Sequence, residues 1–209
     1  PEAAAGGPIV LVEDGDEMPE TYRALATNLG IRLLVVPSPP DDMRTKLFAA
    51  ADIFLSPVDN PQETFGLSLL EAGASSLPSV VSDFDGYRDI VVDGETGYLV
   101  PTLGPAFTPE SDALAGIWFD NQYHLQIAQQ SVVDVPSLAR AIARLAGDAE
   151  LCRKMGAAAR KRVLENFTWT QVVSRLCTLW DELSQTRLPS RPPHEHPLYP
   201  GYPTVFGSY

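Results

Sequence analysis

The chain has 209 residues, with 15 Lys and Arg against 27 Asp and Glu, and a formal net charge of -12 at pH 7. This charge argues against nucleic acid or an anionic membrane surface as a partner, because both would repel a polyanion. No apolar run approaches the roughly 20 residues that a membrane-spanning helix needs. Cys152 and Cys177 both fall in helical patterns, which predicts buried free thiols in a reducing compartment. The start, PEAAAGGP, lacks the features of a signal peptide, so we predict a cytoplasmic location.

Short apolar runs alternate with helical patterns over the first half of the chain. Strands are predicted at Pro8 to Val12, Arg32 to Val36, Ile53 to Leu55, Val80-Val81 and Tyr98 to Val100. Pro19 opens a helix that Gly30 closes, and Asp41 or Asp42 is expected to cap the next helix. This alternation predicts an α/β, Rossmann-like parallel sheet with helices on both faces.

The second half of the chain is predicted to add an insertion, three helices and an arm. Residues 102–135 read as an insertion that packs on the sheet. Helices follow with expected N-caps at Asp134, Asp148 and Thr168. Residues 187–209 are rich in Pro and Tyr and cannot form a core, so they are predicted to be an extended or disordered arm. We therefore expect one domain over residues 8–186, followed by the arm.

The most informative stretch runs from Glu63 to Val100 and reads as a loop, a helix, a strand and a turn. The helix is expected to start near Thr64 to Gly66. The first amides of a helix have no partner within it and carry a partial positive charge, so they suit a phosphate. Here these amides would be those of Thr64, Phe65, Gly66 and Leu67. Glu71 lies roughly 6 Å further along the axis, where an ionised carboxylate could accept both hydroxyl protons of a ribose.

Taken singly, Glu63 is better explained as a helix-start carboxylate and Glu71 as a solvated helix residue. The whole string is more specific. Glu63 and Glu71 stand as E-x7-E, and E-x-F-G-L-x-x-L-E-A is followed by LPSVVSD and DGETGYLVP. This string resembles the donor-binding domain of retaining GT-B glycosyltransferases, the group related to glycogen and sucrose synthases. The resemblance runs from about Val10 to about Leu183 and is densest over residues 52–100.

The resemblance implies one half of a GT-B fold that binds a nucleotide-diphosphate sugar as the donor, with no metal and no other cofactor. It implies that Glu63, the catalytic residue, contacts the transferred sugar and that Glu71 holds the ribose. The amides of Thr64, Phe65, Gly66 and Leu67 would hold the sugar and the phosphate. A loop that corresponds to Val36, Pro37 and Ser38, at the carboxyl end of the second strand, would contact the nucleobase.

Two departures from the family pattern bear on the site. Asp85-Gly86 stands where the family commonly has a Gly-Gly pair, so Tyr87 and Arg88 are candidates for shaping the donor pocket; pairing of Arg88 with a surface carboxylate is the alternative. The family's phosphate-clamping Arg and Lys, and its N-terminal acceptor domain, would precede Pro8. We therefore expect this chain to supply the donor-binding half and to transfer no sugar by itself.

Other functions remain open on the sequence. They are a non-catalytic sugar-nucleotide-binding or interaction module, and a GT-B phosphorylase or epimerase. Asp83-Phe84-Asp85 and Asp14-Gly15-Asp16 spell the D-x-D of metal-dependent glycosyltransferases, but in an acidic chain this pattern is usually a turn. Neither G-x-G-x-x-G nor the phosphate-binding loop of NTPases occurs, which argues against dinucleotide oxidoreductases and NTPases of that class.

Overall fold

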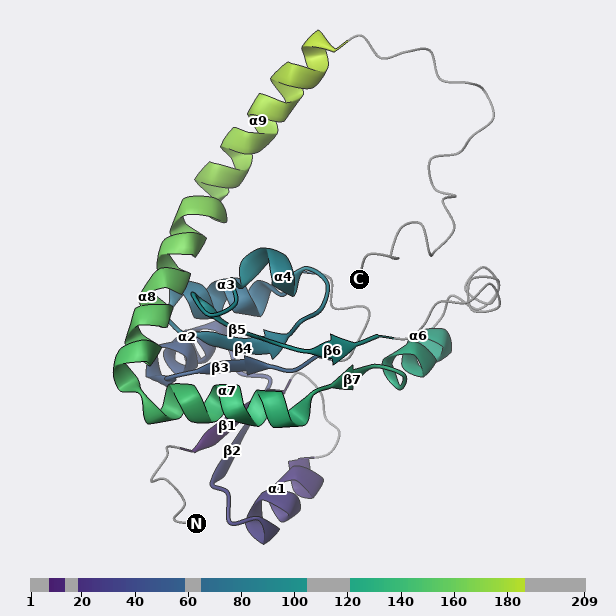
Figure 1. The fold of residues 1–209 in the computed structure, drawn as a ribbon, viewed down its shortest axis with the longest axis vertical. Coiled ribbons are helices and arrows are strands. Elements are labelled where there is room, and N and C mark those ends of the chain that lie inside the picture. Colours follow the sequence, from purple (N-terminus) through teal and green to yellow (C-terminus); the bar gives the residue numbers. More distant parts are fainter. Residues whose placement is uncertain (1–7, 14–18, 59–64, 105–120, 187–209) are drawn as a thin grey trace. The chain divides into compact units, whose positions relative to one another are not determined.

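The structure, a computed structural model, describes residues 8–13, 19–58, 65–104 and 121–186 (Figure 1). The predicted positions Glu63 and Thr64, and the predicted arm at 187–209, lie outside the described residues. The chain divides into two compact units, Pro1–Ala51 and Asp52–Tyr209. The single domain expected over residues 8–186 stays a prediction.

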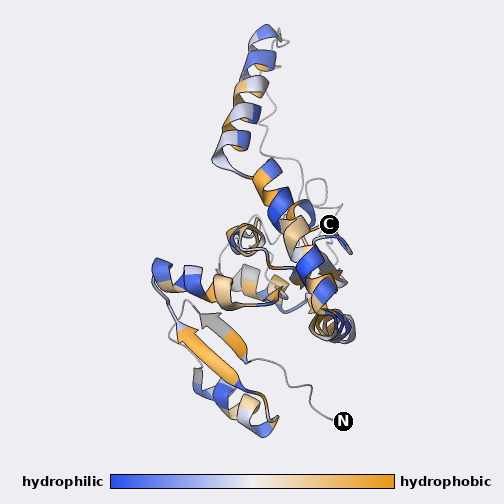
Figure 2. Ribbon diagram, turned by 90° about the vertical axis from the view of Figure 1, so that its left-hand side faces the viewer, coloured by the Kyte–Doolittle hydropathy of each residue, from blue (hydrophilic) through white to orange (hydrophobic). Residues whose placement is uncertain are grey.

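The first unit is a small parallel β-α-β-α arrangement. Its elements are β1 (Ile9–Glu13), α1 (Pro19–Asn28), β2 (Leu33–Pro37) and α2 (Asp41–Ala50). Strands β1 and β2 pair in parallel, with Ile9 opposite Leu33. Val35 and Val36 of β2 are buried, and the hydrophobic colour of this strand is plain in Figure 2.

The start of α2 differs from the sequence prediction. The residue at the N-cap is Pro40, and no side chain caps the helix, so the capping role predicted for Asp41 or Asp42 is wrong. Both aspartates already lie in the first turn. Asp41 instead forms an ion pair with Arg44 at 2.8 Å, and Asp42 forms one with Lys46 at 3.0 Å.

The second unit is built on a three-stranded parallel sheet. Its strands are β3 (Phe54–Ser56), β4 (Ser79–Ser82) and β5 (Gly97–Val100), in the order β3-β4-β5. Helix α3 (Leu67–Ala74) connects β3 to β4, and the short α4 (Tyr87–Ile90) connects β4 to β5. The remaining described elements are β6 (Thr102–Leu103), α6 (Asn121–Ala128), β7 (Val132–Val133), α7 (Val135–Gly147), α8 (Ala149–Asn166) and α9 (Trp169–Gln185). Strands β6 and β7 pair antiparallel.

Neighbouring residues of β4 reach opposite faces of this sheet. Val81 packs in a cluster with Leu69 of α3 and with Tyr87 and Ile90 of α4. Val80 packs in a second cluster with Leu145 of α7 and Met155 of α8. Because successive side chains of a strand point to opposite faces, each face of β4 has its own core. The predicted α/β class, with parallel strands and helices on both faces, is confirmed (Figure 1).

The three predicted N-caps on the last helices are confirmed. Asp134, Asp148 and Thr168 each accept a hydrogen bond from the backbone N–H three residues ahead, at the starts of α7, α8 and α9. Such caps satisfy amides that the helix itself leaves without a partner. Among the helices that the structure describes, none combines the length and apolar character needed to cross a bilayer.

The two cysteines are free thiols, as predicted, but they differ in exposure. Cys152 is partly buried, and its sulfur lies 3.3 Å from the carbonyl oxygen of Asp52. Burial, reinforced by the negative charge of Asp52, raises the pKa of the Cys152 thiol. Cys177 is exposed on α9, so the prediction of its burial is wrong. No residue of α9 is buried, and apolar and polar residues interleave along it in Figure 2.

Candidate functional site

The N-terminus of α3 is the local structure on which the predicted donor site depends. The helix begins at Leu67 rather than near Thr64 to Gly66. Gly66 has φ 80° and ψ 66°, a left-handed conformation that cannot continue into the helix. Its carbonyl oxygen accepts a hydrogen bond from the Leu69 amide at 3.0 Å. The amides of Leu67 and Ser68 therefore open the helix, and no acidic residue lies in its first turn to compete with an anion.

Tyr87 fixes the residue that precedes this helix. A Cβ atom added to Gly66 would stand 2.5 Å from Cε1 of the Tyr87 ring, so the ring fills the space of a side chain. Tyr87 is 2% exposed, and its hydroxyl lies 2.9 Å from Oγ of Ser56 at the end of β3. Tyr87 therefore belongs to the core beneath the α3 N-terminus and does not offer its ring to a ligand.

The other predicted residues of this segment face solvent. Phe65 and Leu67 are 44% and 69% exposed, and Glu71 is also exposed. Glu71 lies four residues after Leu67 on α3, as the sequence indicates. The structure thus brings Phe65, Gly66, Leu67 and Glu71 together on one short segment, with Glu63 and Thr64 outside the described residues.

Arg88 pairs with a carboxylate, which was one of its two interpretations. Its Nε donates to Oδ1 of Asp83 at 2.7 Å, and its Nη2 donates to the Asp83 carbonyl oxygen at 3.0 Å. These bonds join the first turn of α4 to the end of β4. The Asp83-Phe84-Asp85 segment is thereby a connection between β4 and α4, in line with the turn predicted there.

Asp85 has φ 40°, again in the left-handed region, where the family pattern commonly has glycine. Asp tolerates this conformation better than most residues. Burial raises the pKa of the Asp85 carboxyl, and the nearby charge of Asp89 adds to that rise. The Gly86 amide and the Arg88 charge act in the opposite direction but do not cancel it.

Two arginines of helix α8 donate hydrogen bonds to backbone carbonyl groups of α3 and α4, and the sequence analysis assigned them no function. Arg160 donates to the carbonyl oxygen of Ala74 at the end of α3. Arg162 donates to the carbonyl oxygens of Asp89 at 2.6 Å and Ile90 at 2.8 Å. Positive charge at the C-terminal end of a helix complements its dipole. No local spacing in the sequence reveals these contacts, because each joins residues more than 70 positions apart.

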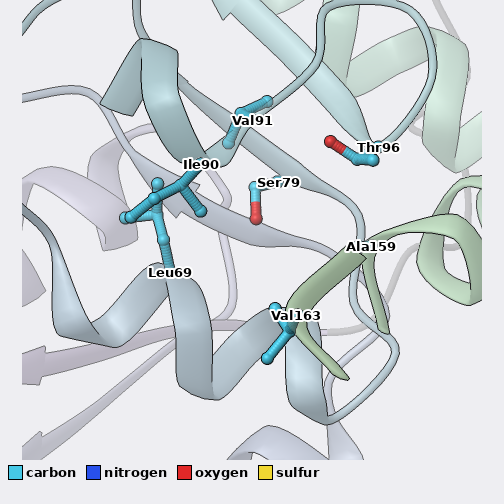
Figure 3. A pocket seen from close by; sticks show the side chains of 8 residues that line it. Leu69, Ser79, Ile90, Val91, Thr96, Ala159 and Val163 are labelled. Atoms are coloured by element: carbon cyan, nitrogen blue, oxygen red, sulfur yellow. The ribbon is translucent and has the colours of Figure 1, made fainter. Parts of the chain in front are cut away.

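The enclosed space behind α3 is too small for a ligand. It measures about 10 Å³ and lies among α3, β4, α4 and α8 (Figure 3). Its lining is mostly aliphatic, with hydroxyls from Ser79 and Thr96. A volume this small has room for a single water at most. A larger hollow of about 560 Å³ is lined by residues 101, 103 and 132–136 and by none of the predicted donor-binding residues. Among the described residues, no group of three or more His, Cys, Asp or Glu is arranged to hold a metal.

The predicted nucleobase contacts lie in the first unit, where β2 ends. Val36 and Pro37 are the last residues of β2. Ser38 follows with φ 39° and is exposed, whereas the Val36 side chain is 7% exposed. Any contact from Val36 would therefore have to come from its backbone.

Comparison with known proteins shows which family this chain resembles. Residues 4–105 match the family described as glycosyl transferases group 1. Over these residues the chain resembles group 1 glycosyl transferases, and the resemblance to glycosyltransferases inferred from the string between Glu63 and Val100 is confirmed.

Two relatives illustrate the extent of the similarity. D-inositol 3-phosphate glycosyltransferase from Corynebacterium efficiens is 39% identical over 118 residues, which cover 54% of this chain and 26% of that protein. N-acetyl-alpha-D-glucosaminyl L-malate synthase from Bacillus anthracis is 29% identical over 172 residues, which cover 82% of this chain and 36% of that protein. This chain thus spans between a quarter and two fifths of the length of these relatives.

Solved structures share the fold at lower identity. Sucrose-phosphate synthase from Thermosynechococcus elongatus has a TM-score of 0.55 and 24% identity, covering 84% of this chain and 38% of its own. Anabaena HepE in complex with UDP and glucose has a TM-score of 0.55 and 20% identity, covering 86% of this chain and 41% of its own. At this identity the likeness shows the fold alone, and the predicted fold class is confirmed.

Proposed function

We propose that this chain is the donor-binding half of a retaining GT-B glycosyltransferase that uses a nucleotide-diphosphate sugar. The observation that carries the proposal is the arrangement at the start of α3. There a left-handed Gly66 leads into a helix with no carboxylate in its first turn, and Glu71 follows one turn later. This arrangement suits a pyrophosphate at the amides and a ribose at Glu71. The relatives named as glycosyltransferases support the reaction type.

The proposed chemistry takes place on one face of the donor sugar. The bond between the anomeric carbon and the leaving phosphate oxygen breaks, and a bond from the acceptor oxygen to that carbon forms on the same face. The acceptor's hydroxyl proton passes to the departing phosphate oxygen. The main catalytic work is then to stabilise charge that grows on this phosphate, and the amides of Leu67 and Ser68 at the start of α3 would contribute to it. Glu63 would orient the transferred sugar.

Titration of the 209-residue chain with UDP, GDP and ADP tests the proposal. At least one of these nucleoside diphosphates should bind. Glu71→Gln keeps the size of the side chain but loses its charge, so the affinity should fall roughly ten- to a hundredfold, corresponding to about 1.4–2.8 kcal/mol. Glu63→Gln should leave this affinity nearly unchanged, because its proposed partner is the sugar.

Glu95→Gln, an exposed carboxylate in the turn before β5, is the matched control and should bind as the unchanged chain does. Equal losses at Glu63 and Glu71, or a loss only at Glu63, would show that the two carboxylates are assigned to the wrong ends of the donor. Failure of the unchanged chain to bind any of the three nucleotides would overturn the proposed function.

A further inference from the structure

Two contacts of Tyr87 link the start of α3 to the end of β3. The phenol oxygen lies 2.9 Å from Oγ of Ser56, although the two residues are 31 positions apart. The ring of the same residue occupies the space beside Gly66, where an added Cβ would stand 2.5 Å from Cε1 and 3.1 Å from Cδ1. The hydroxyl therefore sets where the ring lies, and the ring sets how closely the Gly66 backbone can approach.

A second hydrogen bond holds the other side of the same connection. Ser82, the last residue of β4, is fully buried, and its Oγ donates to the carbonyl oxygen of Val58 at 2.6 Å. The Val58 amide in turn donates to the Ser56 carbonyl oxygen at 3.0 Å. Val58, just before the segment 59–64, is thus held by Ser82 of β4, and Gly66, two residues after that segment, is held by Tyr87 of α4.

Tyr87 can act as a fixed support because α4 itself is fastened at both ends. Arg88 ties its first turn to Asp83 through the ion pair of 2.7 Å. Arg162 of α8 donates to the carbonyl oxygens of Asp89 and Ile90 at its other end. A helix of only four residues has little stability of its own, so these contacts determine its position.

We propose that Tyr87 is a positioning residue for the donor phosphate, and this inference rests on the proposed function above. Tyr87 is buried and does not touch the ligand. Through its ring it holds Gly66, and hence the Leu67 and Ser68 amides, in the place where a pyrophosphate would be bound. The bond to Ser56 keeps the ring in the space beside Gly66.

The test compares three variants of the 209-residue chain in the titration with UDP, GDP and ADP. Tyr87→Phe removes the hydroxyl and keeps the ring, and Ser56→Ala removes the partner. Each single variant, and the double variant, should weaken binding of the preferred nucleotide by about three- to tenfold. The double variant should be no worse than the worse single variant, because all three lose the hydrogen bond between Tyr87 and Ser56.

Tyr98→Phe is the matched control. Tyr98 lies on β5, and its buried hydroxyl has no hydrogen-bond partner among the described residues. It should leave nucleotide affinity within twofold of the unchanged chain. All titrations are run well below the thermal midpoint of each variant, where every variant is folded. If the role of the hydroxyl were merely structural, the midpoint would fall and the affinity would not change.

The same samples give a readout in the absence of nucleotide. The backbone order parameter of the Gly66 amide should fall in Tyr87→Phe and Ser56→Ala and stay unchanged in Tyr98→Phe. If the unchanged chain binds nucleotide and Tyr87→Phe binds it equally well, the positioning role is wrong and the proposed function stands. If the unchanged chain binds none of the three nucleotides, the proposed function fails and the positioning role fails with it.

Discussion

Nε of Arg162 lies 2.8 Å from the carbonyl oxygen of Ile90, so a guanidinium from α8 holds the last residue of α4. The same group donates to Asp89 and lies over the ring of Phe167, 5.9 Å from its centroid. One side chain thereby joins two elements that lie more than 70 residues apart in the sequence. Because α4 carries Tyr87, this contact bears on both the stability of the second unit and the geometry at Gly66.

Arg162→Gln should lower the free energy of unfolding by about 1.5–3 kcal/mol, the range for a hydrogen bond to a charged group. The two carbonyl oxygens would lose their charged donor. Lys161→Ala on the same helix is the control, because the Lys161–Glu165 pair is exposed and its atoms are 3.9 Å apart. It should change stability by less than about 1 kcal/mol. Urea denaturation measures both, and similar losses in the two variants would mean that Arg162 does not hold α4.

The caps of the last helices could be predicted because they are local. Asp134, Asp148 and Thr168 each bond a backbone amide three residues away, so residue type and spacing carry the information. The four-residue α4 was not predicted. Tyr87 and Ile90 are its buried residues, and it depends on partners that are distant in sequence rather than on a periodic pattern.

In the candidate site, too, the local features could be predicted from the sequence and the contacts between distant residues could not. The E-x7-E spacing, with Glu71 on a helix that starts close to Gly66, is visible in a single string of residues. The start of the helix was placed too early because nothing local shows that Gly66 is left-handed. That conformation accompanies the ring of Tyr87, 21 positions later, and the Ser56 hydroxyl that holds it.

Asp85 is predicted to make stability depend on pH. Burial, aided by Asp89, raises the pKa of its carboxyl in the folded chain above the ordinary value of 3.8. The folded state therefore binds this proton more tightly than the unfolded state, and the contribution of Asp85 to stability is lost as pH rises through the folded pKa. Asp85→Asn should consequently be more stable than the unchanged chain at pH 7, and the difference should shrink as pH falls toward 3.8. Asn also tolerates the left-handed backbone.

Asp134 gives a comparison of opposite sign within the same chain. The hydrogen bond from Ser137 lowers the pKa of its carboxyl below 3.8. Its contribution is present above that value and is lost as pH falls through the folded pKa. Asp134→Ala should therefore be less stable at pH 7, and the loss should diminish in acid. Denaturation curves at several pH values measure both variants. A loss of stability in Asp85→Asn at pH 7 would contradict the burial argument.

The nucleobase contact is tested by backbone amide shifts on adding the nucleotide that binds. Val36 and Ser38 should shift because they lie at the carboxyl end of β2, where ligands of open α/β sheets bind. Pro37 has no amide proton and gives no signal of its own. The Val92 amide, which donates to Oγ1 of Thr96 at 2.9 Å, serves as the reference that should not shift. If Glu71 shifts while Val36 and Ser38 do not, the base is bound elsewhere.

The close approach of α8 to the end of α3 gives the last prediction. A Cβ on Gly156 would stand 2.0 Å from the carbonyl oxygen of Ser76, a backbone atom that cannot swing aside. Gly156→Ala should therefore push α8 away from α3 and lower the free energy of unfolding by about 1–3 kcal/mol, the usual cost of overpacking. Gly147→Ala is the matched control, because no atom of the described residues lies within 4 Å of the added Cβ. At the end of α7 it should be neutral or stabilise by up to about 1 kcal/mol, since alanine favours the helix. Urea denaturation of both variants distinguishes an effect of lack of space from an effect of helix propensity. A gain in stability at both positions would show that α8 can move aside at no cost.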